Sequence, residues 1–233
     1  AASYKYGADV TVAPQATAPG YTFSGWSRND FTMPAENVTI TGSFTANSNT
    51  EYTVRHHFQN ILDDAYDADT AMLSETLSGT TDTLTAAAAK TVAGFTAQSF
   101  QQKNIAGDGS TVVDIYYNRN SYKIVFFNGG VMAKTVNVKY QQDISDQDYT
   151  PTTPPVGKTD HTFNGWYEDE ECTSQFVFAG ETMPAYNITL YAGWDGRDYT
   201  VTAHGKSDHA ETVEKGDTVS PDLFASVIPD VGE

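Results

Sequence analysis

The chain repeats itself, and this repetition constrains the fold more than any other feature. The sequence Thr-Phe-Ser-Gly-Trp at residues 22–26 returns as Thr-Phe-Asn-Gly-Trp at 162–166, and the segment 32–40 returns in similar form at 182–190. The connection between the two blocks is longer in the second copy, so one loop varies while the frame around it keeps its spacing. Repetition of this kind predicts a tandem array of modules.

Composition fits several small domains and excludes some partners. The 233 residues are 39% hydrophobic, enough for real cores, although modules of about 70 residues lie near the lower limit of independent stability. Thirteen Lys and Arg against 30 Asp and Glu give a net charge of −17, which repels nucleic acid and anionic membranes. No apolar run is long enough to cross a bilayer. We therefore expect no nucleic-acid partner and no membrane insertion within this chain.

The pattern of β-branched and aromatic residues predicts a mainly β protein. In the run 112–117, alternation places Val113, Ile115 and Tyr117 on one face, which we expect to be the core face. Asn128-Gly129-Gly130 predicts a hairpin turn. The alanine-rich segment 84–90 leaves a short helix and a strand equally open, because its alanines favour helix and its threonines do not. The predicted strands are 10–12, 38–40, 52–54, 112–117, 122–127, 134–138 and 188–191.

The points at which the motifs restart predict the domain boundaries. Short polar joints at 46–50, 118–121 and 195–198 precede or begin new strands. Such joints are too short for free tumbling, so we expect an elongated tandem array of small domains with short linkers. The predicted domains are 1–48, 50–119, 120–195 and 196–233.

Several aromatic, histidine and acidic residues are candidates for binding, each with a structural alternative. The rings of the Phe-x-Gly-Trp motif suit either core packing or stacking on carbohydrate. His56 and His57 are adjacent, so in a strand they point to opposite faces and cannot easily share one metal ion. The aspartates of the 60s lack the glycine and the closing glutamate of a calcium loop, which favours a solvated acidic loop. These aspartates are Asp63, Asp64, Asp67 and Asp69.

No set of residues forms a catalytic motif. The acidic run 168–171 is either solvated surface or a cation site. Cys172, the single cysteine, cannot form an internal disulfide and has no nucleophile context. Ser207, Asp208 and His209 include hydrolase residue types without a nucleophile elbow. We therefore assign no catalytic, cofactor-binding or metal-binding residues and expect no enzyme activity.

Three ordered blocks resemble the internalin B-repeat family of bacterial surface proteins. They are Gly-Tyr-Thr-Phe-x-Gly-Trp at 20–26, the opening strand and Gly-Gly turn at 122–130, and Asn-Ile-Thr-Leu-Tyr-Ala-Gly-Trp at 187–194. Only 120–195 looks complete, because the first copy lacks the opening strand and the last lacks everything after its second strand. The first copy also has Phe44 where the second has Trp194. The resemblance implies a small β-grasp-like (α+β) fold with four or five strands on a short helix or loop.

Residues 50–119 resemble a mucin-binding-protein-like repeat, a module that alternates with B-repeats in surface adhesins. The resemblance lies in Tyr-Thr-Val-Arg-His-His-Phe at 52–58, Gly-Phe-Thr at 94–96 and the strand that ends in Tyr-Tyr-Asn-Arg at 116–119. It implies a second small β-grasp-like fold. It does not by itself establish that this copy binds mucin.

These observations predict non-catalytic stalk or spacer repeats of a bacterial cell-surface adhesin. The protein would be extracellular, secreted or attached to the cell wall, and this chain would be a monomeric part of a longer one without a cofactor. The alternative is an adhesive module in which residues 50–119 bind host glycan, mucin or protein. A glycan site would need one or two rings with flanking polar groups on a shared open face.

Overall fold

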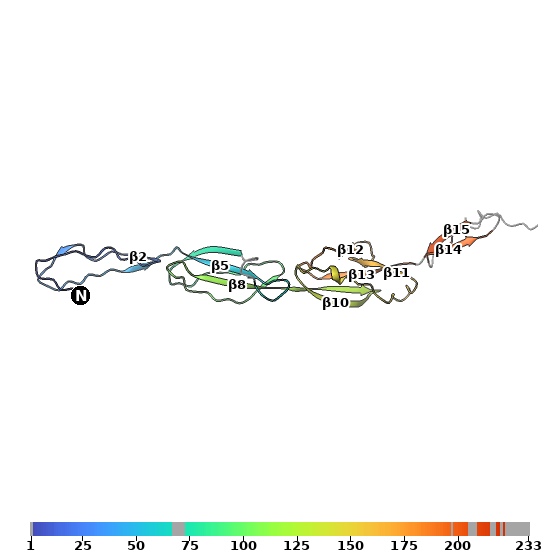
Figure 1. Ribbon diagram of the computed structural model, residues 1–233, viewed down its shortest axis with the longest axis horizontal. Helices are drawn as coiled ribbons and strands as arrows, with labels where there is room; N and C mark the ends of the chain where they lie inside the picture. The colour runs from blue at the N-terminus through green and yellow to red at the C-terminus, as the bar shows by residue number, and fades with distance from the viewer. Residues whose placement is uncertain are drawn as a thin grey trace, which may run out of the picture. The chain divides into compact units, whose positions relative to one another are not determined.

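The computed structural model describes residues 2–66, 73–196, 198–204, 209–214, 218–219 and 221 (Figure 1). The chain divides into two compact units, residues 1–119 and 120–233. The prediction of a mainly β fold is confirmed, since the described strands form several small sheets. Within residues 2–66 and 73–196, helical structure is confined to one 3₁₀ turn, η1 (Ser145–Gln147).

The first part of unit 1 contains two small antiparallel sheets. β1 (Asp9–Val10) pairs with β3 (Phe31–Thr32), and β2 (Tyr21–Phe23) pairs with β4 (Phe44–Ala46). The strand expected at 38–40 is wrong, because these residues have no ladder partner. In the second copy, the equivalent strand pairs with the opening strand of its segment, which has no counterpart among the described residues of 1–48.

Residues 50–119 form a four-stranded sheet in the order β6-β5-β8-β7. Its two central strands are parallel, and both outer strands are antiparallel to their neighbours. The predicted core face is confirmed: Val113, Ile115 and Tyr117 are almost completely buried, together with Tyr52 and Val54 from the neighbouring strand. The bounds are β5 (Thr50–Phe58), β6 (Leu73–Gly79), β7 (Phe95–Ala97) and β8 (Val112–Arg119).

The alanine-rich segment 84–90 is neither the helix nor the strand that the sequence left open. It is irregular apart from one isolated bridge between Leu84 and Asn104. Side chains bond its backbone: the amide of Ala86 donates to the Tyr52 hydroxyl at 3.0 Å, and the amide of Ala87 to Gln102 Oε1 at 3.0 Å. These bonds replace the helical or ladder bonds that propensity alone anticipates.

Unit 2 contains a five-stranded sheet in the order β10-β9-β13-β11-β12. The predicted hairpin is confirmed, because Gly129 and Gly130, both with positive φ, form the turn between β9 and β10. β9 is parallel to β13, so the first and last strands of this segment are neighbours. A separate antiparallel hairpin, β14 (Asp198–Ala203) and β15 (His209–Glu214), follows. The sheet strands are β9 (Ser121–Asn128), β10 (Val131–Lys139), β11 (Thr162–Tyr167), β12 (Gln175–Phe176) and β13 (Ile188–Asp195).

Trp166 lies at the centre of the unit 2 core. It is 1% exposed, its ring packs against those of Phe126 and Tyr149, and its indole N–H donates to the Tyr149 carbonyl at 2.8 Å. A buried tryptophan whose polar nitrogen is also satisfied contributes a large share of a small core.

Replacing Trp166 with alanine should lower the free energy of unfolding of the sheet by about 3–5 kcal/mol, the usual cost of a large aromatic cavity. Amide hydrogen exchange on β9 and β13 measures this change. Tyr186, which is 67% exposed, supplies the control. Tyr186→Ala should stay within about 0.5 kcal/mol of the unchanged protein; equal effects of the two substitutions would contradict the assignment of Trp166 to the core.

Candidate functional site

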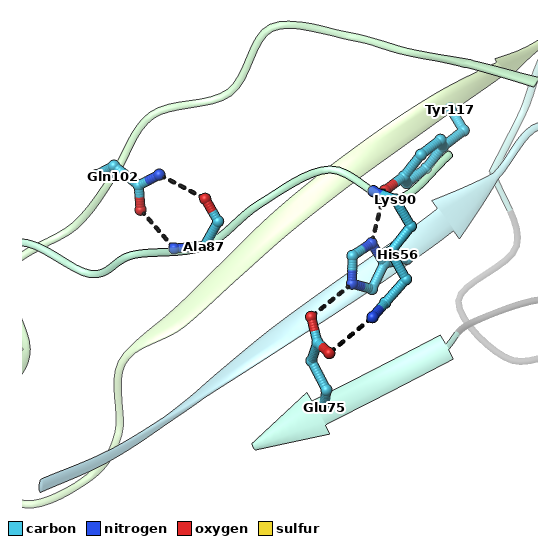
Figure 2. A network of polar contacts seen from close by, with 6 residues as sticks. All are labelled: His56, Glu75, Ala87, Lys90, Gln102 and Tyr117. Atoms are coloured by element: carbon cyan, nitrogen blue, oxygen red, sulfur yellow. Dashed lines mark hydrogen bonds and ion pairs between the residues drawn. The ribbon is translucent and has the colours of Figure 1, made fainter. Parts of the chain in front are cut away.

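A closed ring of polar contacts links strands of the 50–119 sheet to the irregular segment that carries Lys90 (Figure 2). His56 Nδ1 lies 2.7 Å from the Tyr117 hydroxyl, and His56 Nε2 lies 3.2 Å from Glu75 Oε1. The ammonium of Lys90 donates to Glu75 Oε2 at 2.8 Å, and the amide of Lys90 donates to the Tyr117 hydroxyl at 2.8 Å. The ring joins β5, β6, β8 and the irregular segment that contains Lys90.

One assignment of the protons satisfies every group in this ring. The Tyr117 hydroxyl accepts from the Lys90 amide and donates its own proton to His56 Nδ1. A neutral His56 then carries its proton on Nε2 and donates it to the Glu75 carboxylate. A doubly protonated His56 would leave the Tyr117 proton without its acceptor, so we assign the neutral Nε2–H tautomer.

The hydrogen bonds of the ring hold these segments of the fold together and are not arranged as a reactive centre. His56 and Tyr117 are both 0% exposed, and the contacts of the ring occupy both nitrogens of His56. Glu75 and Lys90 are the more open members, and hydrogen bonds from Lys90 and then from His56 hold the pKa of the Glu75 carboxyl below its ordinary value. A charged Glu75 is therefore the form that the surrounding groups favour.

The side chain of Gln102 holds the segment around Ala87 in place by hydrogen bonds (Figure 2). Its amide nitrogen donates to the Ala87 carbonyl at 2.8 Å, while its carbonyl oxygen accepts from the Ala87 amide at 3.0 Å and from the Thr85 hydroxyl at 2.6 Å. A primary amide can serve a backbone donor and acceptor at once, as a neighbouring strand would.

The opposite face of this sheet carries a second, more open cluster. His57 stacks on Tyr116 with ring centroids 4.7 Å apart, and its Nε2 lies 2.8 Å from Asp114 Oδ1. Tyr66 meets Tyr116 edge to face at 5.1 Å and donates to Asn118 Oδ1 at 2.5 Å. The expectation that His56 and His57 face opposite sides is confirmed. Tyr116 is 39% exposed, so one ring of the cluster is accessible to solvent.

The rings of the Phe-x-Gly-Trp motif pack against other rings. Phe23 is 8% exposed and meets Trp26 edge to face at 5.0 Å, and Phe163 meets the buried Trp166 at 5.4 Å. Core packing is thereby confirmed for Phe23 and Trp166, which are the buried members of the two pairs.

Most of the acidic candidates accept hydrogen bonds from nearby residues of their own loops. Asp63 Oδ1 accepts from the Asn60 side chain and from the Ala65 amide, both at 3.0 Å. In the run 168–171, Asp169 accepts from the amides of Thr173 and Ser174 at 2.9 and 2.7 Å, and the Thr173 bond is the main cause of its lowered pKa. The remaining candidate aspartates are Asp64, whose Oδ1 accepts from Gln59 at 3.0 Å, and Asp67 and Asp69, which lie outside the described residues.

The cysteine and the C-terminal triplet provide no assembled site. Cys172 is half-buried, and burial is the main cause that raises the pKa of its thiol, which disfavours the reactive thiolate. Ser207 and Asp208 lie outside the described residues, and His209 is described only as the first residue of β15.

Two properties of the described residues bear on cofactors and membranes. No group of three or more His, Cys, Asp or Glu side chains among them is placed to hold a metal ion. In the same part of the chain, no helix has the length and apolar character needed to cross a membrane.

The sequence interpretation did not foresee the contacts that Glu75, Lys90 and Gln102 make here. One signal was present: alternation placed the Tyr117 ring on the core face, and a buried hydroxyl requires a partner. His56 shares the parity of Tyr52 and Val54 in β5, which placed it within reach. The partners in β6 and in the irregular segment come from contacts distant in sequence, so spacing could not identify them.

Tyr117→Phe should lower the free energy of unfolding of the 50–119 sheet by about 1–3 kcal/mol, because it leaves the Lys90 amide and His56 Nδ1 without their shared partner. Amide exchange at Val113 and Ile115 measures the effect. Tyr116→Phe, on the open face, is the matched control and should change stability by less than about 0.5 kcal/mol. A loss of equal size in both variants would contradict the role of the ring.

Two family models match parts of the chain. Residues 122–193 match the Listeria-Bacteroides repeat domain, and residues 1–48 match the divergent InlB B-repeat domain. The resemblance to B-repeats is confirmed for these two segments, whereas the mucin-binding-like assignment of 50–119 stays a prediction.

Curated relatives include proteins of two bacteria. Internalin H of Listeria monocytogenes is 42% identical over 52 residues, which is 22% of this chain and 9% of the relative. A provisionally named Gly-rich membrane protein of Evansella cellulosilytica is 28% identical over 250 residues, which is 92% of this chain and 27% of that protein. A provisionally named membrane protein of the same species is 36% identical over 105 residues, covering 43% of this chain and 15% of the relative. The chain thus spans about a quarter or less of the length of these relatives.

Proposed function

We propose that this chain is a non-catalytic spacer in a bacterial cell-surface protein and that its repeats resist tension along the chain. The observation that carries the proposal is shared by two segments. In 50–119 and in 120–195, the first strand and the last strand are parallel, hydrogen-bonded neighbours. We propose the predicted boundaries at 48, 119 and 195 as the limits of the repeats.

Parallel terminal strands place the hydrogen-bond ladder in the path of the force. Tension enters a repeat at the start of its first strand and leaves at the end of its last, so it drives the two strands past each other. In this shear geometry the ladder bonds between the paired strands must yield together. The paired stretches run from Thr53 beside Val112 to Phe58 beside Tyr117, and from Ile124 beside Ile188 to Phe127 beside Tyr191.

In 50–119 the polar ring adds to the bonding between the same two strands, β5 and β8. His56 stands on the first strand and Tyr117 on the last, and their side chains bond at 2.7 Å within a fully buried environment. This contact adds a side-chain bond to the ladder between the strands that tension would separate.

The comparisons and the charge support a position at the cell surface. The B-repeat matches and the short alignment with a protein named internalin H agree with a repeat region of a surface protein. A net charge of −17 disfavours binding to nucleic acid. We propose that the protein is extracellular, either secreted or attached to the cell wall.

A second candidate function is adhesion through residues 50–119. The observation that favours it is the open cluster of Tyr116, Tyr66 and His57, with the polar side chains of Asp114 and Asn118 beside it. Partly exposed rings flanked by hydrogen-bonding groups are suited to stacking on a sugar. Host glycan or mucin would be the partner of this face.

Pulling single molecules tests the spacer function. In the full chain with Cys172→Ser, handles on S121C and D195C would load β9 and β13 in shear. Handles on S121C and K139C would instead open the β9–β10 hairpin, because Ser121 and Lys139 are directly paired across it. At one loading rate we expect a rupture force several times higher in shear than in peeling, since peeling breaks the bonds one pair at a time.

The comparison holds the protein constant and changes only the direction of force. Amide exchange on β9 must first show that both double-cysteine variants are folded. Equal rupture forces in the two geometries would exclude the proposed resistance to tension.

Binding to immobilised mucin and to a glycan array at physiological salt tests the adhesive function. We expect Tyr116→Ala to weaken saturable binding by about tenfold or more, as truncation of a central aromatic contact usually does. Tyr186→Ala is the control: it makes the same substitution at an exposed tyrosine of unit 2 and should leave binding unchanged. Absence of saturable binding, or the same affinity in Tyr116→Ala, would exclude this face as a glycan site.

A further inference from the structure

Within unit 1, the end of the first B-repeat copy meets residues 50–119 through backbone groups. The Thr81 amide donates to the Asn47 carbonyl at 2.9 Å, and the Asn47 amide donates to the Gly20 carbonyl at 2.8 Å. The Thr81 hydroxyl also donates to the Gly20 carbonyl at 2.8 Å. Thr81 is 2% exposed, so the groups that it contributes to these bonds are buried.

Two glycines make this approach possible. A Cβ on Gly20 would lie 2.3 Å from Gly107 Cα, and a Cβ on Gly107 would lie 2.0 Å from the Pro19 carbonyl oxygen. Both distances are far below van der Waals contact and involve backbone atoms that cannot turn aside. Gly20 also has a φ of +77°, which a residue with a side chain rarely adopts.

A side-chain bond lies beside the glycine contact. The Tyr21 hydroxyl donates to Asp82 Oδ2. Asp82 has a φ of +65°, and its amide donates to the Ile105 carbonyl at 2.9 Å. The turn that carries Thr81 and Asp82 is therefore fixed by its own repeat in a conformation that presents both residues to the first copy.

The first copy has little core of its own. Among the described residues of 1–48, Val10 and Phe23 are the buried hydrophobic residues, and the strands form only two-stranded sheets. Two-stranded sheets are marginally stable in water unless another surface supports them. The contact with Thr81, Asp82 and Gly107 is such a surface.

We infer that Thr81, Asp82 and Gly107 form a docking socket for the Pro-Gly-Tyr turn of the first copy, residues 19–21. Residues 1–48 depend on this socket for their folded state. The inference stands independently of the proposed function, since the socket would act with or without tension on the chain.

The socket discriminates between the two copies of the repeat. At the positions of Gly20 and Tyr21 the second copy has Asp160 and His161. Asp160 carries a side chain where the socket tolerates no Cβ, and it does not adopt the positive φ of Gly20. His161 lacks the phenol that donates to Asp82. The second copy therefore cannot dock on such a socket in the way the first copy does.

Amide hydrogen exchange on the full chain tests the inference through Gly107→Ala, a change outside residues 1–48. We expect the amides of Ser24, Met33 and Asn47 to exchange at least about tenfold faster, because their opening no longer has to break the docked contact. The amides of Val113 and Ile115 should keep their protection, which shows that the sheet of 50–119 remains folded. Unchanged exchange in residues 1–48 would overturn the inference.

Gly20→Ala and Gly25→Ala form a matched pair on the other side of the contact. Both glycines have positive φ, at +77° and +85°, but a Cβ on Gly25 would meet nothing within 4 Å. Both substitutions introduce backbone strain, and only the first introduces the clash. We expect Gly20→Ala to accelerate exchange well beyond Gly25→Ala; equal acceleration would mean that strain, and not docking, is responsible.

If Gly107→Ala also exposes the sheet of 50–119, Tyr21→Phe decides the question without altering the backbone. Removal of the phenol hydroxyl should speed exchange of the Asn47 amide while Val113 stays protected. An unchanged rate at Asn47 would count against the socket.

Discussion

The parallel pairing of a segment's first strand with its last is the constraint on which the two larger sheets depend. In 50–119 this pair is β5 and β8, and in 120–195 it is β9 and β13. Each pair occupies the middle of its sheet and supplies much of the core, so a segment is incomplete until its last strand has joined its first. Residues 38–40 show the contrast, because these β-branched residues have no ladder partner in the described part of 1–48.

Long polar side chains provide the second organising interaction. The connection through residues 84–90 has no strand beside it for most of its length, yet its backbone groups find partners in the hydroxyls of Tyr52 and Tyr117 and in the amide of Gln102. A tyrosine on the core face extends its hydroxyl beyond the sheet, where a buried oxygen and an unpaired backbone amide satisfy each other. The connection is thus held without regular secondary structure.

Features set by local pattern could be predicted, and features set by distant contacts could not. Alternation in β8 identified its buried face, and Asn128-Gly129-Gly130 identified the hairpin, because both depend on neighbours in sequence. Propensity failed at residues 84–90 and 38–40, where the presence or absence of a distant partner decides the structure. The partners of His56 were missed for the same reason: Glu75 and Lys90 come from separate segments, and no short motif links them.

The residues of the shared motif are separate from those through which the first copy contacts residues 50–119. The two copies share Thr-Phe-x-Gly-Trp, in which Phe23 of one copy and Trp166 of the other are buried, but differ at the two positions just before it, which are Gly20-Tyr21 in one copy and Asp160-His161 in the other. A substitution at these positions can change the joint without disturbing the core, since Gly20 contacts Gly107 rather than the buried rings. If the proposed socket holds, repeats that share this motif can differ in how firmly they attach to the next module, and the order of modules becomes a property that selection can act on independently of the motif.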